Sequence, residues 1–196
     1  MNSRLRKLLL VLPALLAALA LGACSDNSHT KVTTGTYAGE SGQNAPYLDV
    51  GPLTYEVQLS RQLNPTNSED SSYLKGLTAE EAKLEPGQEW FAVFLQVYNH
   101  GSVAHTASTS ISISDTQNNL YQPILPDQTN EYAYRGGEVP ANGRLPILDT
   151  TAAFGPTQGT MLLFKIQVVS LDNRPLEVKI VDPLDPAEYA SAELDV

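Results

Sequence analysis

The chain has 196 residues, a formal net charge of −10, 17% charged residues and a single cysteine. This length fits one globular domain, and one cysteine excludes an internal disulfide and the multi-thiolate ligand sets of structural zinc and iron–sulfur sites. The acidic balance also excludes nucleic acid as an expected partner, because the capture of phosphates needs clustered Lys and Arg.

Residues 1–23 have the pattern of a secretory signal peptide. Basic side chains over 4–7 precede an apolar run over 8–20, which is shorter than the roughly 20 residues that a membrane-spanning helix needs. The run ends in small residues directly before the only cysteine. This ending resembles the lipobox of bacterial lipoproteins and consists of Leu21, Gly22, Ala23 and Cys24.

The lipobox resemblance implies that Cys24 carries a diacylglyceryl group, with acyl chains such as palmitate, and becomes the first residue of the mature protein. Acyl chains contribute about 0.8 kcal/mol per buried methylene, so two or more anchor a protein stably. The resemblance therefore implies an extracytoplasmic protein, lipid-anchored to the bacterial cell membrane. The alternative is that Cys24 is an incidental thiol in an ordinary leader.

Residues 24–46 consist of Cys24 followed by a stretch of Ser, Asn, Thr, Gly and Gln with few apolar side chains. Such a segment cannot bury enough apolar surface to offset the entropy of ordering it. The composition predicts a flexible polar tether between the lipid and the following domain.

From residue 47 onward the hydrophobic pattern has a period of two, which is typical of β-strands. Apolar residues on both faces of 90–98 predict a central strand covered on both sides. The last two strands are expected to pair as a hairpin across the turn at 171–174. The predicted strands are 53–59, 90–98, 106–115, 120–124, 161–169 and 176–180, with one more around Leu145, Ile147 and Leu148.

Helix signals are few. Thr78 and Glu81 have the spacing of a capping box and predict a short helix over 78–84, which Pro86 and Gly87 would end. Residues 184–196 are acidic, and we expect them to form a tail that is a short frayed helix or has no regular structure.

About seven short strands without β-α-β alternation predict an all-β fold, an immunoglobulin-like antiparallel β-sandwich over residues 47–183. Its core is expected to hold the inward apolar residues of each strand: Tyr55, Val57, Leu59, Phe91, Val93, Leu95, Val97, Ile111, Ile113, Leu162, Phe164, Ile166, Val178 and Ile180.

Three segments of this pattern carry a family resemblance: Pro86 to Gly101, Asn119 to Pro123 and Met161 to Gln167. Together they resemble the DUF4352 group of bacterial envelope lipoproteins, although a long insertion over 64–86 departs from that group. The resemblance implies a telokin-like, immunoglobulin-like module that binds or supports other molecules outside the cytoplasm, with no catalytic residues to transfer.

Two histidines are the candidate metal ligands. His100 and His105 lie five residues apart and could begin a zinc or copper site. The alternative is that both face water in a turn, since no third ligand lies near them in the sequence. No cofactor is predicted.

Catalytic signals are weak. No Gly-x-Ser-x-Gly elbow is present, and the cysteine is assigned to lipid, so the chain is not expected to be an enzyme. The paired carboxylates Glu69–Asp70 and Glu80–Glu81 are expected to be solvated loop charges.

The loop over 127–137 is the candidate interaction loop. Tyr and Arg dominate protein interfaces, and this loop and its neighbourhood supply Tyr121, Tyr132, Tyr134 and Arg135. The alternative is that the tyrosines fold back and cap the core.

The resulting prediction is a non-catalytic, lipid-anchored extracytoplasmic binding or structural module of the bacterial cell envelope. It would contact the membrane through its N-terminal lipid and could have an envelope protein as its partner. The alternatives are a metal-binding lipoprotein that uses His100 and His105, and an accessory subunit of a membrane complex.

Overall fold

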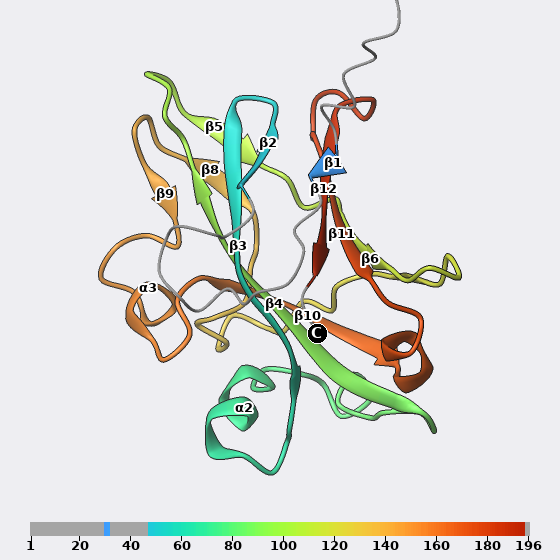
Figure 1. The fold of residues 1–196 in the computed structure, drawn as a ribbon. Coiled ribbons are helices and arrows are strands. Elements are labelled where there is room, and N and C mark those ends of the chain that lie inside the picture. The colour runs from blue at the N-terminus through green and yellow to red at the C-terminus, as the bar shows by residue number, and fades with distance from the viewer. Residues whose placement is uncertain (1–29, 32–46, 195–196) are drawn as a thin grey trace, which may run out of the picture.

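The chain folds into two β-sheets packed face to face (Figure 1). The structure is a computed structural model and describes residues 30–31 and 47–194. The leader and the lipobox, with Cys24, lie outside the described residues. The prediction of an all-β antiparallel sandwich is confirmed.

The strands are distributed over two large sheets and one small one. Sheet A has the order β1 (Thr30–Lys31), β12 (Tyr189–Leu194), β11 (Leu176–Val181), β6 (Ile111–Ser114), β7 (Leu120–Tyr121). Sheet B has the order β10 (Thr160–Gln167), β4 (Gln88–Tyr98), β3 (Leu53–Leu63), β2 (Tyr47–Val50), with β9 (Arg144–Leu145) also on β4. A small separate sheet pairs β5 (His105–Ala107) with β8 (Gly137–Val139).

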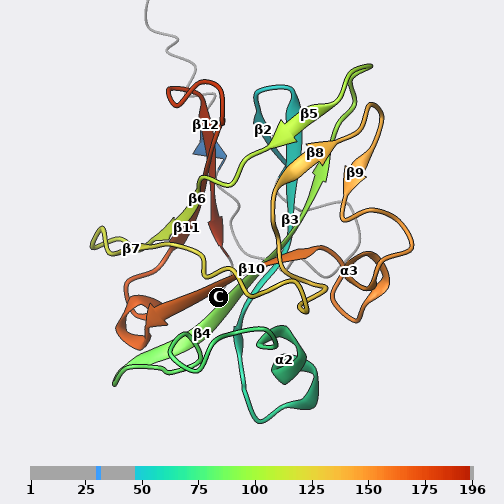
Figure 2. The same ribbon diagram turned by 180° about the vertical axis from the view of Figure 1, so that it is seen from behind.

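Three short helical segments connect the strands: α2 (Ser68–Tyr73), α3 (Thr151–Phe154) and the 3-10 turn η2 (Val168–Leu171). Figure 2, seen from behind, shows α2 beneath β4 and α3 on the opposite side of β4 from β7. None of the helices within the described residues is long and apolar enough to cross a membrane.

The inter-sheet core is formed by the facing sides of sheets A and B. All of the core residues predicted from the sequence are buried except Leu59. A β-bulge in β3 between Val57 and Leu59 is the reason, because one extra residue shifts the alternation and turns Leu59 to the other face of sheet B.

A second, outer core lies on that other face of sheet B. Trp90, Ala92 and Phe94 of β4 pack there with Tyr73 of α2, while Phe91, Val93, Leu95 and Val97 fill the inter-sheet core. The prediction that the 90–98 strand is covered on both sides is therefore confirmed.

The predicted hairpin between residues 161–169 and 176–180 is wrong. β10 pairs with β4 in sheet B, whereas β11 lies between β12 and β6 in sheet A. The chain crosses from one sheet to the other through η2. Alternation identifies the buried face of a strand but not its partner, so it could not distinguish a hairpin from this crossover.

Two segments expected outside the domain contribute strands to it. The predicted acidic tail over 184–196 contains β12, which pairs with all of β11, so the prediction is wrong for Tyr189–Leu194. In the predicted tether, β1 pairs in parallel with Ser191 and Ala192 of β12, so the tether prediction is wrong for Thr30–Lys31.

Local predictions also failed at three places. Thr78 and Glu81 make the reciprocal capping contacts, but residues 78–84 form turns and the helix nearby is α2. The predicted strand near residue 145 is only β9, and Ile147 and Leu148 are exposed. The predicted strand over 106–115 is divided between β5 and β6.

Candidate functional site

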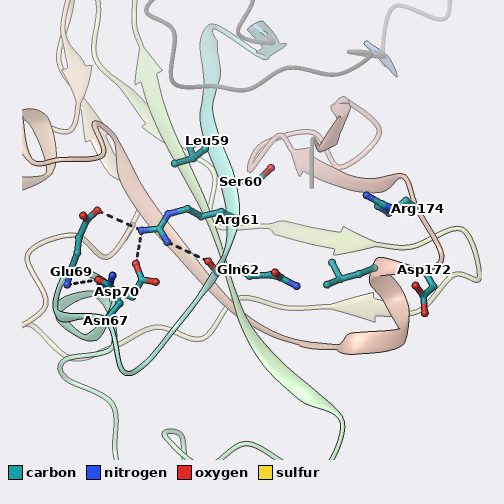
Figure 3. A pocket seen from close by; sticks show the side chains of 10 residues that line it. Leu59, Ser60, Arg61, Gln62, Asn67, Glu69, Asp70, Asp172 and Arg174 are labelled. Carbon is teal, nitrogen blue, oxygen red and sulfur yellow. Dashed lines mark hydrogen bonds and ion pairs between the residues drawn. The ribbon is translucent and has the colours of Figure 1, made fainter.

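A groove runs along β3 between α2 and the turn that follows η2 (Figure 3). We call it the Arg61 groove; its volume is about 850 Å³. Leu59, Ser60, Arg61 and Gln62 form its floor. One wall comes from Asn67, Glu69 and Asp70, and the other comes from Leu171, Asp172 and Arg174.

The floor of this groove is the second half of β3. β2 pairs with β3 from Leu53 to Glu56, and the four floor residues lie beyond that segment. The bulge after Val57 bends β3 at the point where this pairing ends.

The wall from α2 is held by a buried carboxylate. Asp70 is 4% exposed and accepts hydrogen bonds from Arg61 Nη2 at 2.5 Å and from the Asn64 N–H at 2.7 Å. Burial alone would raise the pKa of Asp70, but these hydrogen bonds and the charge of Arg61 lower it below its usual range. Asp70 is therefore a fixed anion, and the prediction that it is a solvated loop charge is wrong.

The same wall orients the guanidinium of Arg61. Nη2 lies 3.5 Å from Glu69 Oε1, and Nη1 lies 3.3 Å from the carbonyl oxygen of Gln62. The Asn67 side chain caps α2 by accepting from the N–H groups of Glu69 and Asp70. This capping fixes both carboxylates in the first turn, where the helix dipole also favours them. The groove is thus a preformed surface with balanced charges.

The residues of the candidate interaction loop make internal contacts. Tyr134 is 5% exposed, and its hydroxyl donates to the Ser108 carbonyl at 2.6 Å. Tyr132 packs edge-on against Tyr73, with ring centroids 4.8 Å apart. The prediction of a contact residue is wrong for Tyr134, which folds back onto the core as in the alternative, whereas Tyr121, Tyr132 and Arg135 are partly exposed.

The remaining two residues of that loop prediction also make internal contacts. The Tyr121 hydroxyl lies 2.6 Å from Ser170 Oγ, which in turn bonds to Asp115 at 2.7 Å. Arg135 donates to the backbone carbonyls of Pro126 and Asp127. Both residues are thus held in place by the fold, and Arg135 uses only Nη2 for these contacts.

The two candidate metal ligands have different surroundings. His100 stacks on Tyr98, with ring centroids 5.9 Å apart and planes 6° from parallel, and His105 lies in β5 opposite Val139. Among the residues that the structure describes, no group of three His, Cys, Asp or Glu side chains could hold a metal ion.

Sequence reasoning missed the Arg61 groove, although one of its signals was present. Asn67 precedes two acidic residues, a pattern typical of a helix N-terminus that would have located α2. The contact between Arg61 and Asp70 had no such signal, because it depends on how the chain turns from β3 into α2.

No family model matches the chain, and no curated protein matches it. Among solved structures, a functionally unknown protein from Listeria monocytogenes is similar, with a TM-score of 0.51 and 12% identity over 83% of this chain and 87% of that one. The yjhA protein of Bacillus subtilis is similar with a TM-score of 0.50 and 10% identity, over 76% of this chain and 97% of that one. These likenesses concern the fold alone.

A third structure, the ycdA protein of Bacillus subtilis, is described as a candidate lipoprotein. Its TM-score is 0.45 and its identity is 10%, over 79% of this chain and 39% of that one.

Proposed function

We propose that the chain is a non-catalytic, lipid-anchored binding module of the bacterial cell envelope, related to the DUF4352 group. The N-terminal pattern that ends in Cys24 supports the anchor. The strand pattern over residues 86–101 supports the family relation.

The Arg61 groove carries the proposal of a binding role. A groove of about 850 Å³ runs along β3, and hydrogen bonds and an ion pair hold its α2 wall in place. Preformed grooves with a few fixed polar side chains are typical binding sites, and those side chains give specificity.

The groove walls suit an extended protein segment better than a small apolar ligand. Leu59 and Leu171 offer apolar contacts, while Arg61, Asp172 and Arg174 provide charges of both signs along the floor and rim. A polar peptide of mixed charge can meet these groups along the length of the groove. We therefore infer that the occupant is an extended segment of another envelope protein.

The first test locates the binding surface in living cells. A photo-crosslinking amino acid is placed at the exposed Gln62, and a second version carries it at the exposed Ser110, which does not line the groove. We expect a discrete protein adduct from position 62 and none from position 110. An adduct at 110 alone would contradict a binding role for the groove.

A charge-reversal pair makes the test specific. Asp172→Lys reverses the charge of an exposed residue in the groove wall and should reduce the amount of the position-62 adduct at least several-fold. Glu80→Lys makes the same charge change at an exposed position outside the groove and should leave the amount of that adduct unchanged. Equal adducts in both variants would refute recognition by the groove. The identity of the adduct decides whether the partner is a membrane complex, as the accessory-subunit alternative requires.

The anchor is tested separately with Cys24→Ser. Wild-type protein should incorporate a labelled palmitate analogue and sediment with membranes. The variant should lose the label and be released from the membrane. It should still fold, and it should still give the adduct at position 62 in purified envelope extracts. Label retained by the variant would show that Cys24 is not the lipidation site.

A further inference from the structure

A second groove lies near the C-terminal end of β4, away from the Arg61 groove. We call it the Arg144 groove; its volume is about 580 Å³. Its walls include Tyr98, His100, Asn142, Arg144, Ile147 and Leu148. Among its described lining residues there is one guanidinium and no carboxylate, in a chain whose net charge is −10.

The guanidinium of Arg144 is poorly satisfied within the described residues. Its Nε is buried without a hydrogen-bond partner, and Nη1 reaches Gln96 Oε1 only at 3.5 Å, the outer limit of a hydrogen bond. Gln96 Oε1 already accepts the Tyr98 hydroxyl at 2.7 Å. No carboxylate in the described part of the chain lies within 4.0 Å of Arg144, in contrast to Arg61.

The neighbouring polar groups do not replace the missing anion. Glu56, which is 4% exposed, and Arg144 both interact with Tyr98, but no ion pair joins Glu56 to Arg144. Burial and the charge of Glu56 raise the pKa of Tyr98 to about 12 although Arg144 acts to lower it, so Tyr98 is a neutral phenol at physiological pH and offers Arg144 no anion. A guanidinium with unmet donors costs free energy in the unliganded protein, and such groups occur where a ligand completes the site.

The rest of the groove would contact an apolar body. The stacked rings of Tyr98 and His100 form a flat wall, and Ile147 and Leu148 are 61% and 54% exposed beside it. Exposed aliphatic side chains next to an aromatic wall and one fixed charge are typical of sites for small amphiphilic ligands.

We propose that the Arg144 groove binds an organic carboxylate, with the carboxylate paired to Arg144 and an aliphatic body against Ile147 and Leu148. Arg pairs with carboxylates through two parallel N–H···O bonds, which gives both strength and orientation. This second site goes beyond the proposed function, because it does not use the Arg61 groove.

The test measures ligand binding by saturation-transfer NMR with the lipidated chain in lipid nanodiscs and with empty nanodiscs as background. The probe is N-acetyl-L-leucine, and its matched control is N-acetyl-L-leucinamide, which lacks the negative charge. A ligand of this size is expected to bind in the millimolar range. We expect saturable binding of the acid and at least tenfold weaker binding of the amide; equal binding of both would overturn the proposal.

Variants then assign the site to Arg144. Arg144→Gln should abolish binding of the acid, and Arg144→Lys should retain part of it. Lys75→Gln removes one positive charge at an exposed position outside both grooves and should bind normally. Arg144→Gln should also keep the wild-type melting temperature, since it removes a guanidinium with an unmet buried donor. Unchanged acid binding by Arg144→Gln would contradict the assignment.

A longer probe distinguishes the source of the carboxylate. Acetyl-triglycyl-leucine should bind more tightly than N-acetyl-L-leucine if the natural ligand is a peptide C-terminus, and equally if it is a free acid. The outcome is independent of the proposed function, because the crosslink at Gln62 should persist in Arg144→Gln. Loss of the NMR signal with the crosslink retained would separate the two sites.

Discussion

Asn130 provides the sharpest test of how the outer core is held together. Its side chain is 4% exposed and makes four hydrogen bonds to the backbone. Its amide nitrogen donates to the carbonyls of Tyr73 and Lys75 at 2.8 and 2.9 Å. Its amide oxygen accepts from the N–H groups of Tyr132 and Ala133 at 3.0 and 3.1 Å. One side chain thus fastens the end of α2 to the loop over 127–137.

The variant Asn130→Ala should lower the free energy of unfolding by about 3 kcal/mol. Each hydrogen bond contributes about 1 kcal/mol net, and the small space left by the side chain lets water recover part of the loss. Urea unfolding followed by tryptophan fluorescence measures the change, because Trp90 lies in the outer core beside α2. The slope of free energy against urea should stay constant while the midpoint falls.

The matched control is Gln128→Ala, two residues away, at an exposed position. It should change the free energy of unfolding by less than about 0.5 kcal/mol. Asn130→Asp keeps the two acceptor contacts but places a carboxylate against two carbonyl oxygens. It should be destabilised at pH 7 and partly recover near pH 4 as the acid becomes protonated. A loss below about 1 kcal/mol in Asn130→Ala would refute the reasoning.

Three further predictions concern the inter-sheet core and the turn after β6. Val93→Asp should abolish the cooperative thermal transition, since an unpaired charge would be buried, whereas Val169→Asp at a 56% exposed position should melt like wild type. Tyr134→Phe should cost about 1 kcal/mol in urea unfolding by leaving the Ser108 carbonyl without its donor, and a cost near zero would show that water replaces the hydroxyl. Burial alone would raise the pKa of Asp115, but hydrogen bonds from Asn119, Ser170 and Gln117 lower it to about 2. The ionised Asp115 therefore stabilises the folded protein above about pH 4, and this contribution is lost as the pH falls toward 2. Asp115→Asn should therefore lose about 2 kcal/mol at pH 7 and show a flatter stability profile between pH 4 and 2.

The buried strands were predictable because the alternation of apolar and polar side chains indicates which faces of a strand are buried. β4 has apolar residues on successive positions, and only a strand covered on both faces can bury them all. The failure at Leu59 has the same origin, since one bulge residue reverses which side chains point inward and alternation gives no sign of it.

The candidate site depended on contacts that alternation does not encode. The Arg61 groove joins β3 and α2 to the turn after η2, which lies far along the chain. The interaction-loop prediction was wrong at Tyr134 for a related reason. The composition of the loop is the same whether a tyrosine faces outward or inward, and the contacts with Ser108 and Tyr73 are not visible in it.

The strand order has a consequence for how the chain folds. β2, β3 and β4 are consecutive in sequence and adjacent in sheet B, so they can form a meander while the rest of the chain is still unstructured. Sheet A is different, because its two local hairpins, β6–β7 and β11–β12, are far apart in the chain and meet only where β6 pairs with β11. The inward face of the early meander is therefore without its covering sheet until these two hairpins have paired. We expect folding to be slow and rate-limited by this closure, and a holding chaperone to be most useful in the interval before it.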